Sequence, residues 1–125
     1  MQMIIAIGLG GALGAISRHF ATRWISNILG SGFPYGTMSV NVIGSVLMGM
    51  LVTLLANKFA ISQELRGFVA VGLLGGFTTF SAFSLETALL IERNTWGLAA
   101  LYITGSVILS VGGLFVGIWA GKALT

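Results

Sequence analysis

The chain has no cysteine, one proline, one histidine and only three acidic residues among 125. The absence of cysteine excludes a disulfide, a thiolate metal site and a nucleophilic thiol. With a single histidine and no paired carboxylates, the side chains that catalysis usually needs are missing, so we do not expect an enzyme. The glycine-rich segments lack the Lys-Ser or Lys-Thr of a phosphate-binding loop, so no ATP site is expected either.

Charge is also scarce, whereas apolar residues are abundant. Charged side chains make up 7% of the chain and hydrophobic ones 56%, and the mean hydropathy is +1.01. This composition exceeds what a soluble core needs and indicates an integral membrane protein. We predict one all-α domain over residues 1–125, because four spans of about 20 residues each use up the chain. The net charge of +3 is too small for a surface that binds nucleic acid.

The third predicted span is interrupted near its middle. Apolar residues 65–74 and 80–91 would form two half-helices that together match a hydrocarbon core of about 30 Å. Between them lie Gly75-Gly76 and Thr78-Thr79, all poor helix formers, so we expect a break near the bilayer midplane. Unwound backbone at that depth survives only inside protein or beside a water-filled cavity, and half-helix ends there can hold an ion.

Three polar side chains inside the spans have open interpretations. Asn41 in the second span needs hydrogen-bond partners and, taken alone, is explained by a bond between two helices. Glu86 is the only acidic residue well inside a span. It either pairs with a basic group such as Arg93 or has a function, since intramembrane carboxylates usually do. Arg18, in the second half of the first span, lies at the headgroup level or lines a polar vestibule.

The polar groups expected in the membrane interior are rich in hydrogen-bond donors and poor in acids. Phe80 and Phe83 share a face of the second half-helix, and the positive edges of their rings can attract a small anion. Phenylalanines at this spacing are usually packing, and a lone serine often bonds only to the preceding turn. In the fourth span, however, three hydroxyls recur at every fourth residue, on Tyr102, Ser106 and Ser110. This row favours an anion pathway. The donors are Asn41, Thr78, Thr79, Ser81, Ser84, Tyr102, Ser106 and Ser110.

The basic residues are balanced across the membrane. Because the tally is three against three, the positive-inside rule sets no orientation. Copies inserted in both directions could pair about a two-fold axis in the membrane plane, so we predict an antiparallel, dual-topology homodimer. The side with the termini carries Lys58, Arg66 and Lys122, and the other side carries Arg18, Arg23 and Arg93.

Three segments together resemble a known family. The run GGFTTFSAFS at residues 75–84, Asn41, and the run GGALGAISR at residues 10–18 are similar to those of the Fluc (CrcB) fluoride channels. The resemblance implies a passive, fluoride-selective channel that exports fluoride from the cytoplasm. It also implies a multi-pass protein of the bacterial plasma (inner) membrane, assembled as an antiparallel dimer with two pores, each lined by both subunits.

The resemblance also implies roles for particular residues. The ring edges of Phe80 and Phe83 would face the permeating ion, and the Asn41 amide would be a donor to it. The backbone carbonyls of Gly75 and Thr78 in both subunits would hold a buried structural sodium ion, as oxygen ligands suit a hard cation. The pore residues that it implies are Asn41, Phe80, Ser81, Phe83, Ser84, Glu86, Tyr102, Ser106 and Ser110.

One position departs from the family pattern, and other functions compete. Where the family usually has a hydroxyl residue after Ser81, this chain has Ala82, so one donor is missing from the expected pore wall.

The strongest alternative to a fluoride channel is a small dual-topology multidrug exporter that works by proton exchange. Such a transporter needs a membrane-centred carboxylate, and only the off-centre Glu86 could serve. A structural assembly subunit would leave the aligned donors unexplained.

Overall fold

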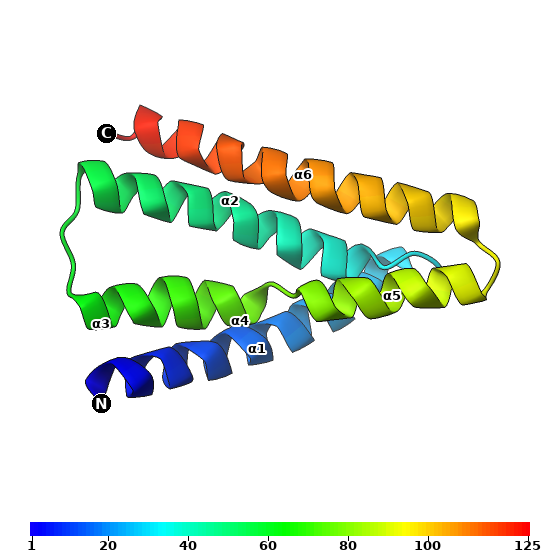
Figure 1. Ribbon diagram of the computed structural model, residues 1–125, viewed down its shortest axis with the longest axis horizontal. Coiled ribbons are helices and arrows are strands. Elements are labelled where there is room, and N and C mark those ends of the chain that lie inside the picture. The colour runs from blue at the N-terminus through cyan, green and yellow to red at the C-terminus, as the bar shows by residue number, and fades with distance from the viewer.

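The computed structural model describes all 125 residues as helices and short connections, without strands (Figure 1). Four rods are long and apolar enough to cross a membrane, which confirms the prediction of four transmembrane helices. Figure 1 shows both termini at the same end of the bundle, as four spans require. The elements are α1 (Gln2–Leu29), α2 (Tyr35–Asn57), α3 (Gln63–Arg66), η1 (Gly67–Leu74), α4 (Gly75–Phe77), α5 (Phe80–Glu92) and α6 (Trp96–Ala123).

Glycines let the rods pack closely in two pairs, α1 with η1 and α6 with α2. A Cβ added to Gly10 or Gly14 of α1 would collide with a backbone carbonyl oxygen of η1. A Cβ on Gly117 of α6 would collide with the Val46 carbonyl oxygen of α2. These glycines form close-packing faces. Lipid supplies no hydrophobic drive between helices, so close backbone packing stabilises the contacts instead.

The third rod is broken, but at its threonines. Thr78 (φ −90°, ψ 158°) and Thr79 (φ −152°, ψ 121°) are extended, whereas Gly75 remains helical at φ −63°. The predicted break of the third helix is therefore confirmed, and within the expected segment it is confined to the two threonines. Gly76 has a different reason to lack a side chain, because an added Cβ would lie 2.7 Å from the Gly11 carbonyl oxygen of α1.

Side chains hold the break open. The Thr79 N–H donates to Asn41 Oδ1 at 2.7 Å, and Asn41 Nδ2 donates to the Thr79 carbonyl oxygen at 3.0 Å. Thr79 Oγ1 accepts the Ala82 N–H at 3.1 Å and caps α5. Two of the amides that a continuous helix would use are thus bonded to side chains, so α5 begins as a separate helix.

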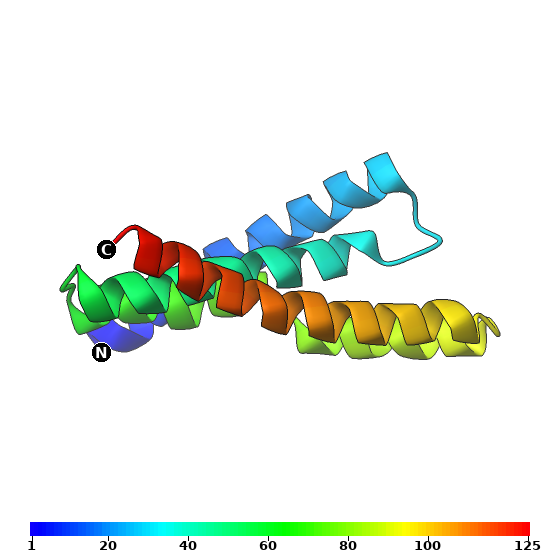
Figure 2. The same cartoon turned by 90° about the horizontal axis from the view of Figure 1, so that it is seen from above.

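The half before the break is not a regular α-helix. Ser62 caps α3 by accepting the Leu65 N–H at 3.1 Å. The following eight residues, Gly67–Leu74, form the π-helix η1. A π-helix has wider turns than an α-helix and often occurs at functional sites. Figure 2 shows that the second half of α1 diverges from α5 and α6, at the end away from the termini.

Candidate ion pathway

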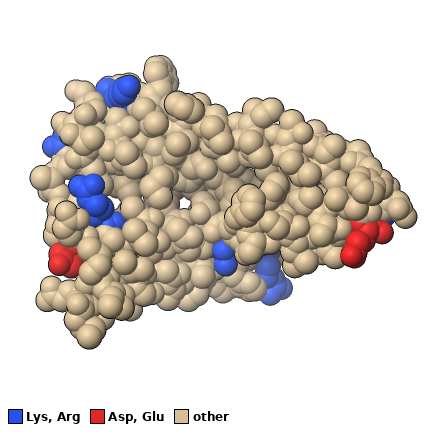
Figure 3. All heavy atoms as spheres, in the orientation of Figure 1, with Lys and Arg blue, Asp and Glu red and all other residues tan.

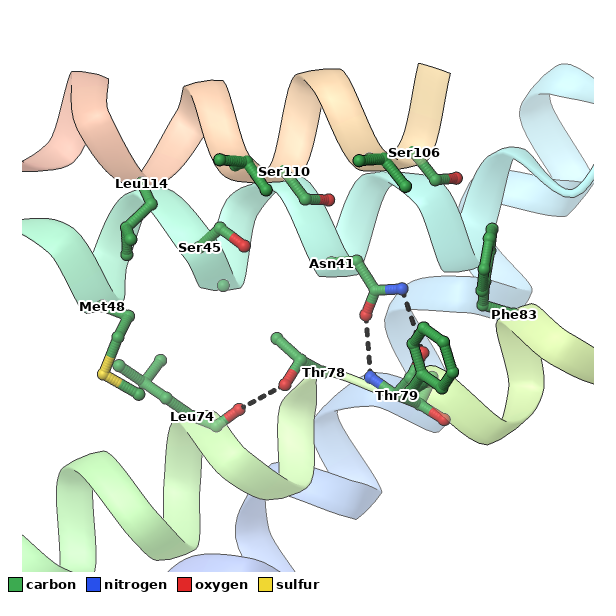
Figure 4. A pocket seen from close by; sticks show the side chains of 14 residues that line it. Asn41, Ser45, Met48, Leu74, Thr78, Thr79, Phe83, Ser106, Ser110 and Leu114 are labelled. Atoms are coloured by element: carbon green, nitrogen blue, oxygen red, sulfur yellow. Dashed lines mark hydrogen bonds between the residues drawn. The ribbon is translucent and has the colours of Figure 1, made fainter. Parts of the chain in front are cut away.

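A cavity of about 390 Å³ lies beside the break, between the third rod and the packed pair of α2 and α6. Figure 4 shows Asn41 and Ser45 of α2, Ser106 and Ser110 of α6, and Thr78 and Thr79 of the break around one space. Of the predicted pore residues it gathers Asn41, Phe80, Phe83, Ser106 and Ser110. The whole lining is Asn41, Gly44, Ser45, Met48, Leu74, Thr78, Thr79, Phe80, Phe83, Ser106, Val107, Ser110, Val111 and Leu114.

Two donors at this first cavity have hydrogen-bonding capacity that the protein does not use. Ser106 is only 6% exposed, and its hydroxyl has no hydrogen-bond partner in the protein. A buried polar group without a partner is unfavourable by about 1–3 kcal/mol. The Asn41 amide has two N–H groups, and only one is used for the Thr79 carbonyl. Asn41 therefore joins two helices and still has a donor left.

The two phenylalanines differ in their surroundings. Their ring centroids are 5.4 Å apart at an interplanar angle of 46°. Phe83 is 9% exposed and packs against the Tyr102 ring at 5.1 Å, so it belongs to the core of this chain. Phe80 is 78% exposed and points out of the chain at the mouth of the first cavity.

A second cavity, of about 400 Å³, opens where α1 diverges from α5. Glu86 lies in its wall, and the Tyr102 hydroxyl donates to Glu86 Oε1 at 3.4 Å. The row of three hydroxyls on α6 is thereby divided. Ser106 and Ser110 face the first cavity, whereas the fully buried Tyr102 is bonded to the wall of the second. The lining is Thr22, Arg23, Ser26, Asn27, Gly36, Thr37, Ala82, Leu85 and Glu86.

Two predicted pore serines line neither cavity. The Ser84 hydroxyl donates to the Phe80 carbonyl oxygen at 3.0 Å, the bond to the preceding turn that serines in helices often make. Ser81 Oγ lies 3.3 Å from Thr79 Oγ1. The sequence also did not single out Ser45 as a pathway donor, although it follows Asn41 by one helical turn, and that spacing was the available signal.

The two carbonyls expected to hold a cation are freed by the break. In a continuous helix the Thr79 N–H would donate to the Gly75 carbonyl and the Ala82 N–H to the Thr78 carbonyl. These two N–H groups are bonded to Asn41 and to the Thr79 hydroxyl instead. The oxygens of Gly75 and Thr78 therefore suit a hard cation, which prefers oxygen ligands.

Arg18 reaches the same place from α1. Its Nη1 donates to the Thr78 carbonyl oxygen at 3.3 Å, which places the partly buried guanidinium at the break. Figure 3 shows blue groups over α1, away from the charged ends of the bundle, and α1 carries Arg18 and Arg23. The sequence is compatible with Arg18 at the headgroup level or in a polar vestibule. No spacing rule predicts its contact with Thr78.

Known proteins resemble this chain along nearly its whole length. Residues 5–118 match the family described as CrcB-like protein, Camphor Resistance (CrcB). A protein of Rhodospirillum centenum named fluoride-specific ion channel FluC is 51% identical over 118 residues, covering 94% of each chain. The protein of that name from Rhodopseudomonas palustris is 50% identical over 121 residues, covering 97% of this chain and 98% of its own. One from Agrobacterium fabrum is 43% identical over 124 residues, covering 99% of both. This chain belongs to the CrcB family.

Proposed function

We propose that this multi-pass membrane protein is a passive fluoride-selective channel, not an enzyme, and that it exports fluoride from a bacterial cytoplasm. Full-length relatives bear the name fluoride-specific ion channel. The observation that carries the proposal is the donor-lined cavity beside the helix break, where the buried Ser106 hydroxyl has no partner in the protein. A donor-rich, acid-free lining suits an anion.

The mechanism follows from the small size of fluoride. A small anion holds its water tightly, so a pore has to replace that shell with several donors and still bind weakly enough to release the ion. In the first cavity Ser106, Ser110 and the second N–H of Asn41 supply such donors. The positive ring edges of Phe80 and Phe83 add an attraction that requires a narrow, dry passage. In the complete channel, the width of that passage would exclude larger halides.

The two cavities form successive parts of the proposed route. Phe83 lines the first cavity, Glu86 lines the second, and Tyr102 contacts both residues. Fluoride enters cells as the neutral acid and ionises inside. The negative interior then drives the anion out with about 2.3 kcal/mol per charge per 100 mV. Export therefore needs no ATP.

The complete channel is proposed to be an antiparallel homodimer with a structural sodium ion at its centre. Each chain offers two freed carbonyls, at Gly75 and Thr78, and a pair of chains related by a two-fold axis would offer four. A bound sodium ion would balance the carbonyl dipoles at the broken helices. The outward-facing Phe80 would then lie at the contact between the two copies, where each pore is lined by both.

Fluoride efflux from liposomes that contain the purified protein tests the proposal, with chloride efflux as the control. We expect fluoride flux without chloride flux. Phe80→Ile should lower the flux and leave folding intact, because Phe80 is 78% exposed in the chain. Vesicles that leak no more fluoride than empty ones would contradict a channel. If organic cations were instead taken up in a pH-dependent way that Glu86→Gln abolished, the exporter would be the better function.

A further inference from the structure

Arg18 contacts one particular oxygen of the break. Its Nη1 lies 3.3 Å from the Thr78 carbonyl oxygen. That oxygen has two lone pairs, and the Ala82 N–H that would use one of them in a continuous helix is bonded elsewhere. The guanidinium takes one lone pair, and the other is left for a second partner. Any cation held by Thr78 therefore shares its ligand with a fixed positive charge.

We infer that Arg18 weakens cation binding at the break and makes the site selective for monovalent over divalent cations. The inference rests on the proposed sodium site. Hard cations bind oxygen at about 2.3–2.6 Å, so an ion on this carbonyl lies within about 6 Å of Nη1. That separation is shorter than the Debye length of about 8 Å, so salt does not screen the repulsion fully.

The repulsion discriminates by ion charge. Coulomb energy scales with the product of the charges, so a divalent ion is repelled by Arg18 twice as strongly as sodium. Carbonyl oxygens alone attract a divalent ion more strongly than a monovalent one. The guanidinium reduces the attraction of the site for a divalent ion by twice as much as for sodium, and this difference favours sodium.

A purely mechanical role for Arg18 makes a different prediction, and two substitutions separate the roles. Arg18→Gln removes the charge and retains N–H donors, whereas Arg18→Lys retains the charge. If Arg18 only anchors the Thr78 carbonyl, Arg18→Gln should leave the preference among cations unchanged. If its charge sets the preference, Arg18→Gln should change it and Arg18→Lys should not. Arg23→Gln is the matched control, because Arg23 on the same helix lines the second cavity instead.

The experiment measures the thermal unfolding midpoint of the detergent-solubilised protein against cation concentration. Sodium chloride, calcium chloride and magnesium chloride each replace choline chloride at constant ionic strength. For the unmodified chain we expect stabilisation by sodium and little by calcium or magnesium. For Arg18→Gln we expect the half-saturating sodium concentration to fall at least about tenfold and stabilisation by calcium to appear. Arg18→Lys and Arg23→Gln should keep the original preference.

Each result decides a separate question. The role of Arg18 is overturned if Arg18→Gln leaves the cation preference unchanged. It is also overturned if calcium stabilises the unmodified chain at lower concentration than sodium, a measurement that needs no variant. An unmodified chain indifferent to sodium would refute the cation site, and Arg18's role with it, while fluoride efflux could still support the channel. Stabilisation by sodium in a protein without fluoride flux would refute the channel and leave the role of Arg18 standing.

Discussion

Removing one oxygen atom, that of the Ser106 hydroxyl, tests the pathway most directly. Its hydroxyl is buried without a partner in the wall of the first cavity. We predict that Ser106→Ala lowers fluoride efflux about tenfold, because a hydrogen bond to a charged group contributes roughly 1.5–3 kcal/mol. Removing an unpaired hydroxyl should not lower the unfolding midpoint. Thr104→Ala, at an exposed position of the same helix, is the control, and equal flux in the two variants would argue against a donor at Ser106.

Ala82 tests the wall of the second cavity. The sequence identified it as the place of a missing donor, and the structure places it in the same lining as Arg23 and Glu86. We predict that Ala82→Thr raises fluoride efflux about threefold, as expected for one added hydrogen bond of somewhat less than 1 kcal/mol. Liposome efflux measures this directly. Flux that stays the same or drops would mean that this wall takes no part in conduction.

Single residues also show why part of the site could not be predicted. Asn41, Ser106 and Ser110 were found because polar groups in apolar spans are conspicuous and helical spacing places them on faces. The bond between Arg18 and the Thr78 carbonyl depends on how α1 crosses the third rod, which no local pattern encodes. Likewise, Tyr102 shares its face with two serines, yet the divergence of α1 creates the second cavity near it.

At the scale of helices, the break was predicted in the right segment, but helix propensity did not locate it within that segment. Low propensity pointed to the glycines and the threonines alike, whereas only the threonines are extended and Gly76 is needed for contact with α1. The break depends on a tertiary partner, since Asn41 of α2 bonds both backbone groups of Thr79. Propensity is a weak prior that such a contact overrides. The π-helix η1 also had no signal in the sequence, because its hydrophobic pattern is the same all round.

Asn41 should therefore be essential to the third rod as well as to conduction. Asn41→Ala leaves the Thr79 N–H and carbonyl without their partners, and each unsatisfied group destabilises by about 1–3 kcal/mol. We predict a clearly lower unfolding midpoint together with loss of fluoride flux. Asn57→Ala, at the exposed end of α2, provides the comparison. If both variants unfolded at the same temperature, the bonds between Asn41 and Thr79 would not be what maintains the break.

The contact between α2 and α6 depends on glycine, and two glycines of α6 that lie five residues apart allow a matched test. A Cβ at Gly117 would collide with the Val46 carbonyl oxygen, whereas one at Gly112 would meet nothing within 4 Å. We predict that Gly117→Ala destabilises the protein by about 1–3 kcal/mol through overpacking. Gly112→Ala should be neutral or slightly stabilising, because alanine favours helix. Thermal unfolding of the two variants is the measurement, and equal midpoints would mean that the helices can separate without penalty.

For the whole molecule, composition predicted more than local pattern did. The number of spans, their approximate limits and the common side of the termini followed from apolar runs separated by short polar segments. Assembly is a different matter. Balanced charge predicts that copies insert in both orientations. Such a mixture is a property of all inserted copies together, and the structure of one chain does not show it.

The absence of cysteine makes dual topology easy to measure. Thr125→Cys places the only thiol of the chain at its exposed C-terminus. In sealed vesicles we predict that a membrane-impermeant maleimide labels roughly half of the copies, since the balanced charges favour neither direction. Disrupting the vesicles should make the remaining copies reactive. Labelling that is complete or absent before disruption would mean a single orientation and would contradict an antiparallel dimer.

Because η1 has wide π-helical turns, the third rod can lose a residue there without a change in its length. A π-helix usually carries a residue more than the α-helix along the same path, so deleting one residue between Gly67 and Leu74 can be absorbed by tightening to α-helical turns. The same deletion inside α5 would rotate every later side chain by about 100° and misalign Phe83 and Glu86. The chain should thus tolerate shortening ahead of the interruption and not behind it.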